Sequence, residues 1–177
     1  MSSPSLRIAA VSLHTSPLEE PGGADAGGMN VVVLEQSLAL ARLGHQVDLF
    51  TRRSDPAAPD VVEVAEGVRL FHLDAGPARP LAKSAMEQAI RPFRAALREV
   101  LTADSAGGWD LLHSHHWFSG VAALPIAREL GIPHLQSFHS VAAPEGAGTL
   151  DAGEPAESEG RIPGEQFAAT GSDLVVA

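Results

Sequence analysis

Short apolar runs alternate along this chain with longer segments whose apolar residues recur every three or four positions. The apolar runs, which we predict to be buried strands, are Ile8 to Leu13, Val47 to Phe50, Val68 to Leu73, Leu111 to Leu112, His134 to Phe138 and Leu174 to Val176. A further run, Val61 to Val64, predicts a short extra strand beside Val68 to Leu73. Strands that alternate with helices indicate a parallel sheet with right-handed crossovers.

Helical periodicity is found between most of these runs. The apolar positions that share a helix face are Val31, Leu34, Leu38 and Ala41, then Met86, Ile90, Phe93, Leu97 and Val100, and then Trp117, Val121 and Leu124. Gly44 ends the first of these helices, Pro92 kinks the second or begins a new one, and Pro125 follows the third. Residues 54–59 and 142–160 are rich in Gly, Pro and polar residues and are predicted to be irregular. We therefore predict an α/β fold in which residues 1–177 form one doubly wound, Rossmann-like domain, with a mainly parallel sheet and helices on both faces.

A glycine-rich turn, Gly22 to Asn30, joins the first predicted strand to the first predicted helix. Glycine lets the backbone approach a ligand closely, and the free amides at a helix start favour an anion such as phosphate. The spacing matches neither G-x-G-x-x-G nor G-x-x-x-x-G-K-[ST], so it does not indicate NAD binding or ATP hydrolysis. The turn predicts a site for a phosphorylated small molecule, with a flexible surface turn as the alternative.

Polar side chains follow several of the predicted strands. Those at the strand ends are His14, Asp74, His113, His115 and His139. Ligands of an open α/β sheet bind beyond the carboxyl ends of its strands, so we expect the histidines to share one edge. The His-rich segment 113–116 is an alternative zinc site, but such a site needs three or four ligands in a defined geometry. We expect a hydrogen-bonding cluster there and no metal site.

Composition narrows the class of function. Twelve basic and 22 acidic residues give a formal net charge of −10, which argues against general binding of nucleic acid or of a membrane surface. The chain has no cysteine, which excludes disulfides and thiolate metal sites. It shows neither a secretory signal pattern nor an apolar run long enough to span a bilayer, so we expect a cytoplasmic protein.

The basic residues are few enough to be informative. Lys83 and Arg161 occupy loop or helix-start positions, and a phosphate group is the ligand that two such cations would clamp if they met at the sheet edge. The arginines that we expect on solvated helix faces are Arg42, Arg94, Arg98 and Arg128.

Four motifs occur in an order that is more specific than any one of them. They are Gly27 to Asn30, Leu43 to Arg52, His113 to Gly120 and Phe138 to Ser140. In this order they resemble the amino-terminal domain of retaining GT-B glycosyltransferases of family 4, and within that family the inositol-phosphate enzymes. The resemblance covers nearly the whole chain. It implies an acceptor-binding half, whose nucleotide-binding carboxyl-terminal domain would begin after residue 177.

The resemblance implies a role for each matching position. Gly27 and Gly28 would lie against the donor diphosphate, and His139 would hydrogen-bond the donor near the reacting sugar. The residues implied for the acceptor are Asn30, Lys83, His116, Ser140 and Arg161. This chain departs from the inositol-phosphate enzymes where His116 replaces a Tyr and Glu145 a Lys. A carboxylate near the pocket opposes an anionic group, so these departures leave the acceptor open.

The same resemblance implies the chemistry. A UDP- or GDP-linked sugar would be the co-substrate, a small phosphorylated polyol or sugar would be the acceptor, and no cofactor would be tightly bound. Same-face attack, in which the leaving phosphate takes the acceptor proton, needs no carboxylate nucleophile, and we find no paired carboxylates at the predicted strand ends. Two alternatives stay open: a nonenzymatic sugar-phosphate-binding module, and another nucleotide-dependent Rossmann-type enzyme that binds a flavin or a nicotinamide.

Overall fold

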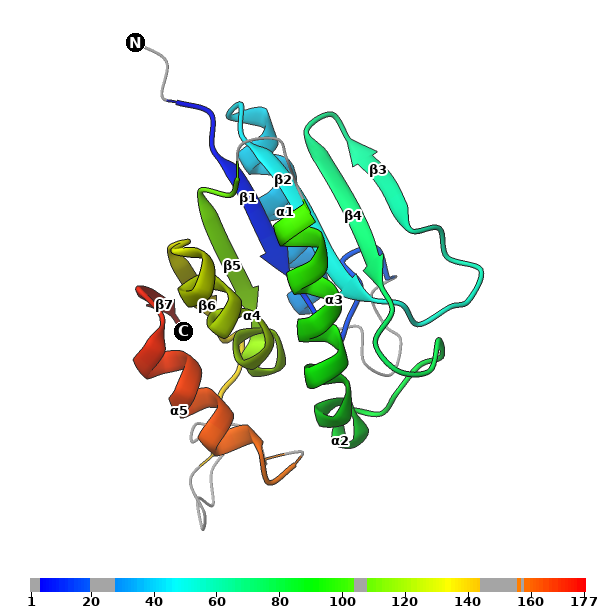
Figure 1. Ribbon diagram of the computed structural model, residues 1–177, viewed down its shortest axis with the longest axis vertical. Helices are drawn as coiled ribbons and strands as arrows, with labels where there is room; N and C mark the ends of the chain where they lie inside the picture. Colours follow the sequence, from blue (N-terminus) through cyan, green and yellow to red (C-terminus); the bar gives the residue numbers. More distant parts are fainter. Residues whose placement is uncertain (1–3, 20–27, 104–107, 144–155, 157) are drawn as a thin grey trace.

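The computed structural model describes residues 4–19, 28–103, 108–143, 156 and 158–177. Strands and helices alternate along the chain (Figure 1). The strands are β1 (Arg7–Val11), β2 (Gln46–Arg52), β3 (Val61–Ala65), β4 (Val68–Leu73), β5 (Leu111–His115), β6 (His134–Ser137) and β7 (Leu174–Val176). The helices are α1 (Gly28–Arg42), α2 (Lys83–Met86), the 3-10 turn η1 (Glu87–Ala89), α3 (Ile90–Ala103), α4 (His116–Leu130) and α5 (Arg161–Gly171). Among these helices, none combines the length and the apolar character needed to cross a membrane.

The described strands form one sheet in the order β3-β4-β2-β1-β5-β6-β7. β1 lies at its centre and pairs in parallel on both sides, so that Val11 is opposite Phe50 of β2 and Ser114 of β5. All pairs are parallel except β3 with β4, which is antiparallel and is the extra strand that the Val61 to Val64 run predicts. The strand order reverses at β1, and in such sheets the reversal places a crevice at the carboxyl end. The predicted fold class is therefore confirmed.

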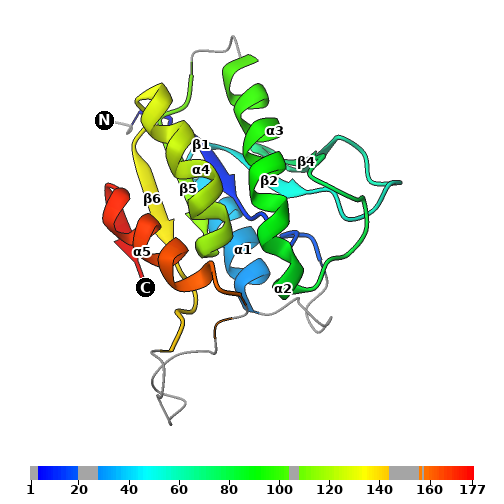
Figure 2. The same cartoon turned by 60° about the horizontal axis from the view of Figure 1, so that its bottom comes forward.

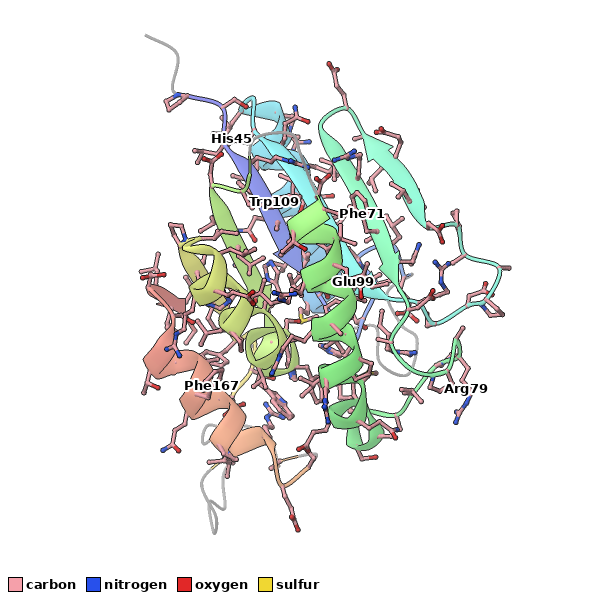
Figure 3. All side chains as sticks on the ribbon, in the orientation of Figure 1. His45, Phe71, Arg79, Glu99, Trp109 and Phe167 are labelled. Atoms are coloured by element: carbon pink, nitrogen blue, oxygen red, sulfur yellow. The ribbon has the colours of Figure 1, made fainter. Side chains whose placement is uncertain are left out.

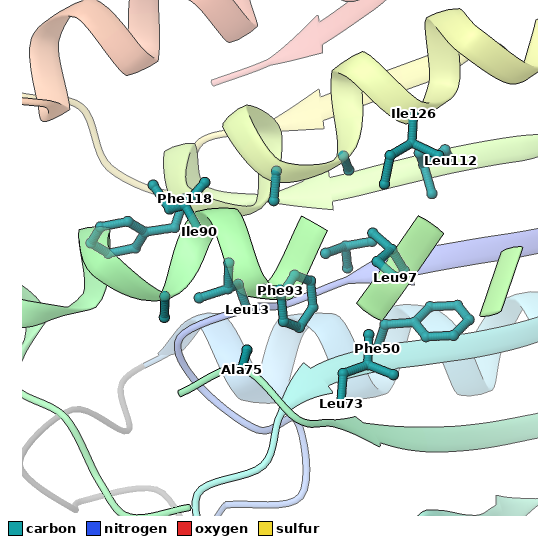
Figure 4. Close-up of a cluster of buried hydrophobic side chains, with 14 of the residues drawn as sticks. Leu13, Phe50, Leu73, Ala75, Ile90, Phe93, Leu97, Leu112, Phe118 and Ile126 are labelled. Carbon is teal, nitrogen blue, oxygen red and sulfur yellow. The ribbon is translucent and has the colours of Figure 1, made fainter. Parts of the chain in front are cut away.

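Two apolar cores hold the layers together, one on each face of the sheet. On one face α3 and α4 pack over the sheet around Phe50, Phe93 and Leu97 (Figure 4). On the other face α1 packs through Val33 against strand residues such as Leu49. Figure 2 shows α1 on the side of the sheet opposite to α3 and α4. Complete burial of side chains of this size stabilises the fold by about 1.5 to 3 kcal/mol each.

The segment from Lys83 to Ala103 is divided as its proline predicts. α2 and η1 form a short helical entry, and α3 begins at Ile90 with Pro92 as its third residue. In the first turn of a helix a missing N–H removes no intrahelical hydrogen bond. Pro92 is therefore compatible with a new helix at this point.

The structure contains one helix that apolar periodicity does not predict. α5 packs against α4, and a Cβ atom at Gly164 would lie 2.5 Å from Cε3 of Trp117. The missing side chain therefore allows the close approach of the two helices. The buried positions of α5 are Arg161, Gly164 and Ala168, which carry little apolar surface. This composition explains why the period of apolar residues gives no signal.

A proline inside α4 explains an unexpected arginine contact. Pro125 has no N–H, so the carbonyl of Val121, four residues earlier, lacks its usual helical partner. Nη2 of Arg94, on α3, donates to this carbonyl at 2.8 Å. Arg94 is partly buried, and this burial lowers its pKa. The prediction that Arg94 lies on a solvated face is therefore wrong, whereas Arg98 is exposed as predicted.

Candidate functional site

The carboxyl edge of the sheet brings together most of the residues predicted for a site. β1, β5 and β6 end at this edge, and α1 and α4 begin at it (Figures 1 and 2). α2 and the first turn of α5 lie at the same end of the molecule. The N–H groups of a first helical turn have no partner within the helix. An edge with several helix starts therefore favours an anion.

Three imidazoles lie in a row along this edge. His113 and His115 are two residues apart on β5 and so face the same side of the sheet, with ring centroids 4.0 Å apart. His139 follows β6 in the left-handed backbone conformation, with φ of 63°, and its Nε2 lies 2.9 Å from Nδ1 of His115. Nε2 of His113 lies 2.9 Å from Oγ of Ser137. The predicted grouping of these histidines at one edge, with hydrogen bonds, is observed.

Loss of hydration favours the neutral form of these imidazoles at physiological pH. Loss of hydration lowers the pKa of His113 to about 4, with further contributions from the charges of His139 and His134. Loss of hydration lowers the pKa of His115 well below 6.5, and the charges of His113 and His139 lower it further. It also lowers the pKa of His139. A neutral ring carries one proton, so each of these side chains donates through one nitrogen and accepts through the other.

A second pair of imidazoles lies at the start of α4. His116, the first residue of α4, has φ of 67°, which is rare for a residue with a side chain, and its ring centroid lies 4.5 Å from that of His14. Its Nδ1 is buried without a hydrogen-bond partner among the described residues. Burial, followed by the charges of His14, Arg161, Lys83 and His139, lowers the pKa of His116 to about 2. A buried nitrogen without a partner is costly, so this atom is suited to a bond from a ligand.

The charges of two cations at helix starts act on His116. Lys83 is the first residue of α2, Arg161 is the first residue of α5, and the charges of both lower the pKa of His116. Arg161 is 2% exposed, its Nε lies 2.8 Å from Oε1 of Glu165, and its Nη2 donates to Oγ of Ser140 at 3.2 Å. Arg161 is thus a buried part of the site, whereas Lys83 is its more accessible cation.

The start of α1 carries the remaining predicted residues. A Cβ atom at Gly28 would meet nothing within 4 Å, so packing does not require a glycine there. Asn30 is buried, and its Nδ2 donates to the carbonyl of Glu19 at 2.5 Å. Its Oδ1 is buried without a partner among the described residues. No described contact joins Asn30 to the histidines, and Gly27 and Glu145 lie outside the described residues.

Arg52 is a residue of this region that the sequence analysis misses. It ends β2, and its guanidinium donates to the carbonyls of Pro77 and Arg79, each at 2.8 Å. These carbonyls belong to the segment that leads to Lys83, so Arg52 holds that segment against the sheet. The side chain of Arg79 itself extends away from the molecule (Figure 3). A basic residue two positions after the apolar run Val47 to Phe50 was the available signal.

Two described carboxylates at this edge are engaged in ion pairs. Asp74, a predicted site candidate, lies 2.6 Å from Nε of Arg53. Glu165 accepts hydrogen bonds from Arg161 and from the amide of Ala142. Within the part of the chain that the structure describes, no three His, Cys, Asp or Glu side chains are grouped so as to hold a metal ion. The chemistry that the described residues offer is therefore hydrogen bonding and charge stabilisation.

Comparison with known sequences shows which proteins this chain is similar to. The sequence pattern of a glycosyl transferase 4-like domain matches residues 27–177. The D-inositol 3-phosphate glycosyltransferases of Xylanimonas cellulosilytica and Thermobifida fusca are each 41% identical to the chain over 171 residues. These residues make up 97% of this chain. They correspond to 41% of the Xylanimonas cellulosilytica protein and 39% of the Thermobifida fusca protein. The chain thus spans about two fifths of the length of these relatives.

Solved structures agree in fold. Sucrose-phosphate synthase from Thermosynechococcus elongatus matches 96% of this chain with a TM-score of 0.81 and 28% identity, and the match covers 41% of that protein. A UDP-glucosyltransferase from Polygonum tinctorium shares the fold over 78% of this chain, with a TM-score of 0.51 and 17% identity. The match covers 30% of the Polygonum tinctorium enzyme.

Proposed function

The chain belongs to the family of glycosyl transferase 4-like domains, and from this premise we propose that it is the acceptor-binding half of a retaining glycosyltransferase. The sugar comes from a UDP- or GDP-linked donor and goes to a small phosphorylated polyol or sugar, without a tightly bound cofactor. The relatives that are named D-inositol 3-phosphate glycosyltransferases support this choice of acceptor. We further propose that residues 1–177 act with a carboxyl-terminal nucleotide-binding domain, and that the enzyme works in the cytoplasm.

Lys83 and Arg161 stand at two helix starts at the same end of the molecule, where the charges of both act on His116, and this arrangement carries the proposal. An anionic acceptor between the two cations would gain charged hydrogen bonds, which are about twice as strong as neutral ones. The unpartnered Nδ1 of His116 and the hydroxyl of Ser140 would bind its ester or hydroxyl oxygens. His116 stays neutral at physiological pH, so it acts by hydrogen bonding. The open Oδ1 of Asn30 would accept from an acceptor hydroxyl.

The donor side of the site is assigned to the start of α1 and to His139. The first-turn amides after Gly28, which have no partner within the helix, and the lack of a side chain at Gly28 suit close approach of a diphosphate. Gly27 would contribute to the same contact. His139 is exposed beside this edge, where it would hydrogen-bond the donor near the reacting sugar.

The proposed chemistry uses positioning and charge stabilisation. The acceptor hydroxyl attacks the sugar on the face from which the diphosphate leaves, and the leaving phosphate takes the hydroxyl proton. Glu165 is unsuited to act as a nucleophile, because Arg161 and a backbone amide already bind its carboxylate. The protein's part is to orient both substrates and to stabilise the charge that develops on the leaving group.

Titration of the purified chain with inositol phosphate, beside unphosphorylated inositol, tests the acceptor site. Lys83→Ala should weaken inositol phosphate binding about tenfold to hundredfold, the equivalent of about 1.5 to 3 kcal/mol for a charged hydrogen bond. Arg79→Ala is the matched control, since it removes the same charge from the same segment at an exposed position. Equal affinity for the two ligands in the unchanged chain would refute the phosphate site.

Arg161 needs a milder substitution than Lys83. Arg161→Ala would leave the partly buried carboxylate of Glu165 without its ion-pair partner and would destabilise the fold, whereas Arg161→Lys retains the charge. We also expect no turnover of a nucleotide sugar by residues 1–177 alone, because the donor site is shared with the second domain. Turnover by this chain would contradict the two-domain proposal, and tight binding of a flavin or nicotinamide would favour a different enzyme class.

A further inference from the structure

His115 links the proposed catalytic residue His139 to the interior of the sheet. It is 1% exposed, it ends β5, and its Nδ1 lies 2.9 Å from Nε2 of His139. On the other side its ring packs against that of His113, with centroids 4.0 Å apart. His115 is therefore held by packing, whereas His139 follows the strand and is exposed. A packed ring is in a position to orient an exposed one.

We propose that His115 is a positioning residue for His139: its Nδ1–H donates to Nε2 of His139 and thereby fixes the ring of His139 with a proton on Nδ1. The Nδ1 atom of His139 has no hydrogen bond among the described residues, so it is the nitrogen left for a ligand. The pair would then present an N–H donor, which suits the oxygen atoms of a sugar nucleotide. This inference rests on the role proposed above for His139.

The direction of the hydrogen bond follows from the surroundings of His115. Two neutral imidazoles that share a hydrogen bond need one proton between the facing nitrogens. Nε2 of His115 has no hydrogen bond among the described residues, and the residue is 1% exposed, so a proton on Nε2 would have little access to an acceptor. On Nδ1 the proton has Nε2 of His139 as its acceptor. The proton therefore resides on Nδ1 of His115, and His139 carries its own proton on Nδ1.

Nitrogen NMR of the whole 177-residue chain tests this arrangement without any substitution. We expect a through-hydrogen-bond coupling between Nδ1 of His115 and Nε2 of His139 at pH 7.5, and chemical shifts that mark Nδ1 of both rings as protonated. Free histidine prefers the proton on Nε2, so an Nδ1–H tautomer at His139 is not the default. Absence of the coupling, or an Nε2–H tautomer at His139, would overturn the inference.

Two aromatic substitutions on β5 separate positioning from packing. His115→Phe keeps a ring in the row but removes the donor, so His139 should change toward the Nε2–H tautomer. His113→Phe is the matched control: it alters the same strand and leaves the pair of His115 and His139 in place, so the tautomer of His139 should not change. Equal shifts in both variants would mean that His115 acts through packing alone.

This test uses no ligand and so fails separately from the proposed function. If inositol phosphate does not bind while the coupling is present, the acceptor proposal fails and the histidine pair stands. If inositol phosphate binds and the coupling is absent, the pair fails and the acceptor site stands.

Discussion

Arg94 and Pro125 allow a direct test of how this fold satisfies a carbonyl that its own helix cannot bond. The carbonyl of Val121 lacks a helical partner because of Pro125, and Arg94 donates to it at 2.8 Å. The perturbation is Arg94→Met, which removes the guanidinium and keeps an unbranched stem for packing between α3 and α4. It is made in the natural chain and again in a Pro125→Ala background. In that background the introduced alanine supplies the missing N–H.

The expected loss of stability depends on whether each substitution leaves the carbonyl of Val121 without a hydrogen bond. A hydrogen bond to a charged group contributes about 1.5 to 3 kcal/mol. A groove between α3, α4 and α5, lined by Arg94 and Val121, would let water reach the carbonyl, so we expect a loss at the lower end, about 1.5 kcal/mol. With Pro125→Ala the carbonyl has a helical partner, and Arg94→Met should cost about 0.5 kcal/mol. The expected coupling is therefore about 1 kcal/mol.

Urea denaturation of the four chains, followed by circular dichroism, measures this coupling. Arg98→Met is the control on the same helix, because Arg98 is exposed in a surface pair with Glu129 and its loss should change stability little. If Arg94→Met costs the same free energy with and without Pro125, within about 0.4 kcal/mol, the two sites are independent and the reasoning is refuted. A changed urea dependence in any variant would show that two-state analysis does not apply to it.

Stability should also depend on pH and on one helix contact. Burial lowers the pKa values of His113 and His134 to about 4 in the folded chain. Between pH 6.5 and pH 4 the unfolded chain therefore binds more protons than the folded chain. The contribution of these histidines to stability is complete above pH 6.5 and decreases as the pH falls toward 4. A urea midpoint that is the same at pH 7 and pH 5 would contradict this. Gly120→Ala should cost about 1 to 3 kcal/mol, because its Cβ would lie 2.9 Å from that of Ala168. Gly28→Ala, where a Cβ has open space, should leave urea stability unchanged, and equal costs would refute the packing argument.

The sheet could be predicted because its strands are short apolar runs separated by turn residues. Strands buried on both faces need apolar residues at consecutive positions, which is a local signal. The edge they share could be predicted as well, since the polar residues that follow parallel strands meet there. α5 could not be predicted, because its buried positions are Arg161, Gly164 and Ala168, and its packing depends on the absence of a side chain beside Trp117.

Contacts between distant residues were the part of the structure that the sequence could not provide. Arg94 has the helical spacing of a surface residue, and its contact with α4 depends on a proline 31 positions later. The sequence predicts Arg161 to be an accessible cation, whereas in the structure it is buried and contacts Glu165 and Ser140. In both cases the guanidinium meets a group that the fold brings close, and neither residue type nor spacing shows that group in advance.

The charge of the chain explains why the candidate site has its particular composition. A formal net charge of −10 repels an anion over the whole surface, so any attraction has to be local. The buried imidazoles add no charge at physiological pH, since burial lowers the pKa of His113 to about 4 and that of His116 to about 2. Attraction then comes from Lys83, from Arg161 and from the helix starts at the carboxyl edge. The local charge attracts different anions equally well. The imidazoles add hydrogen bonds of fixed direction, and these discriminate between the anions.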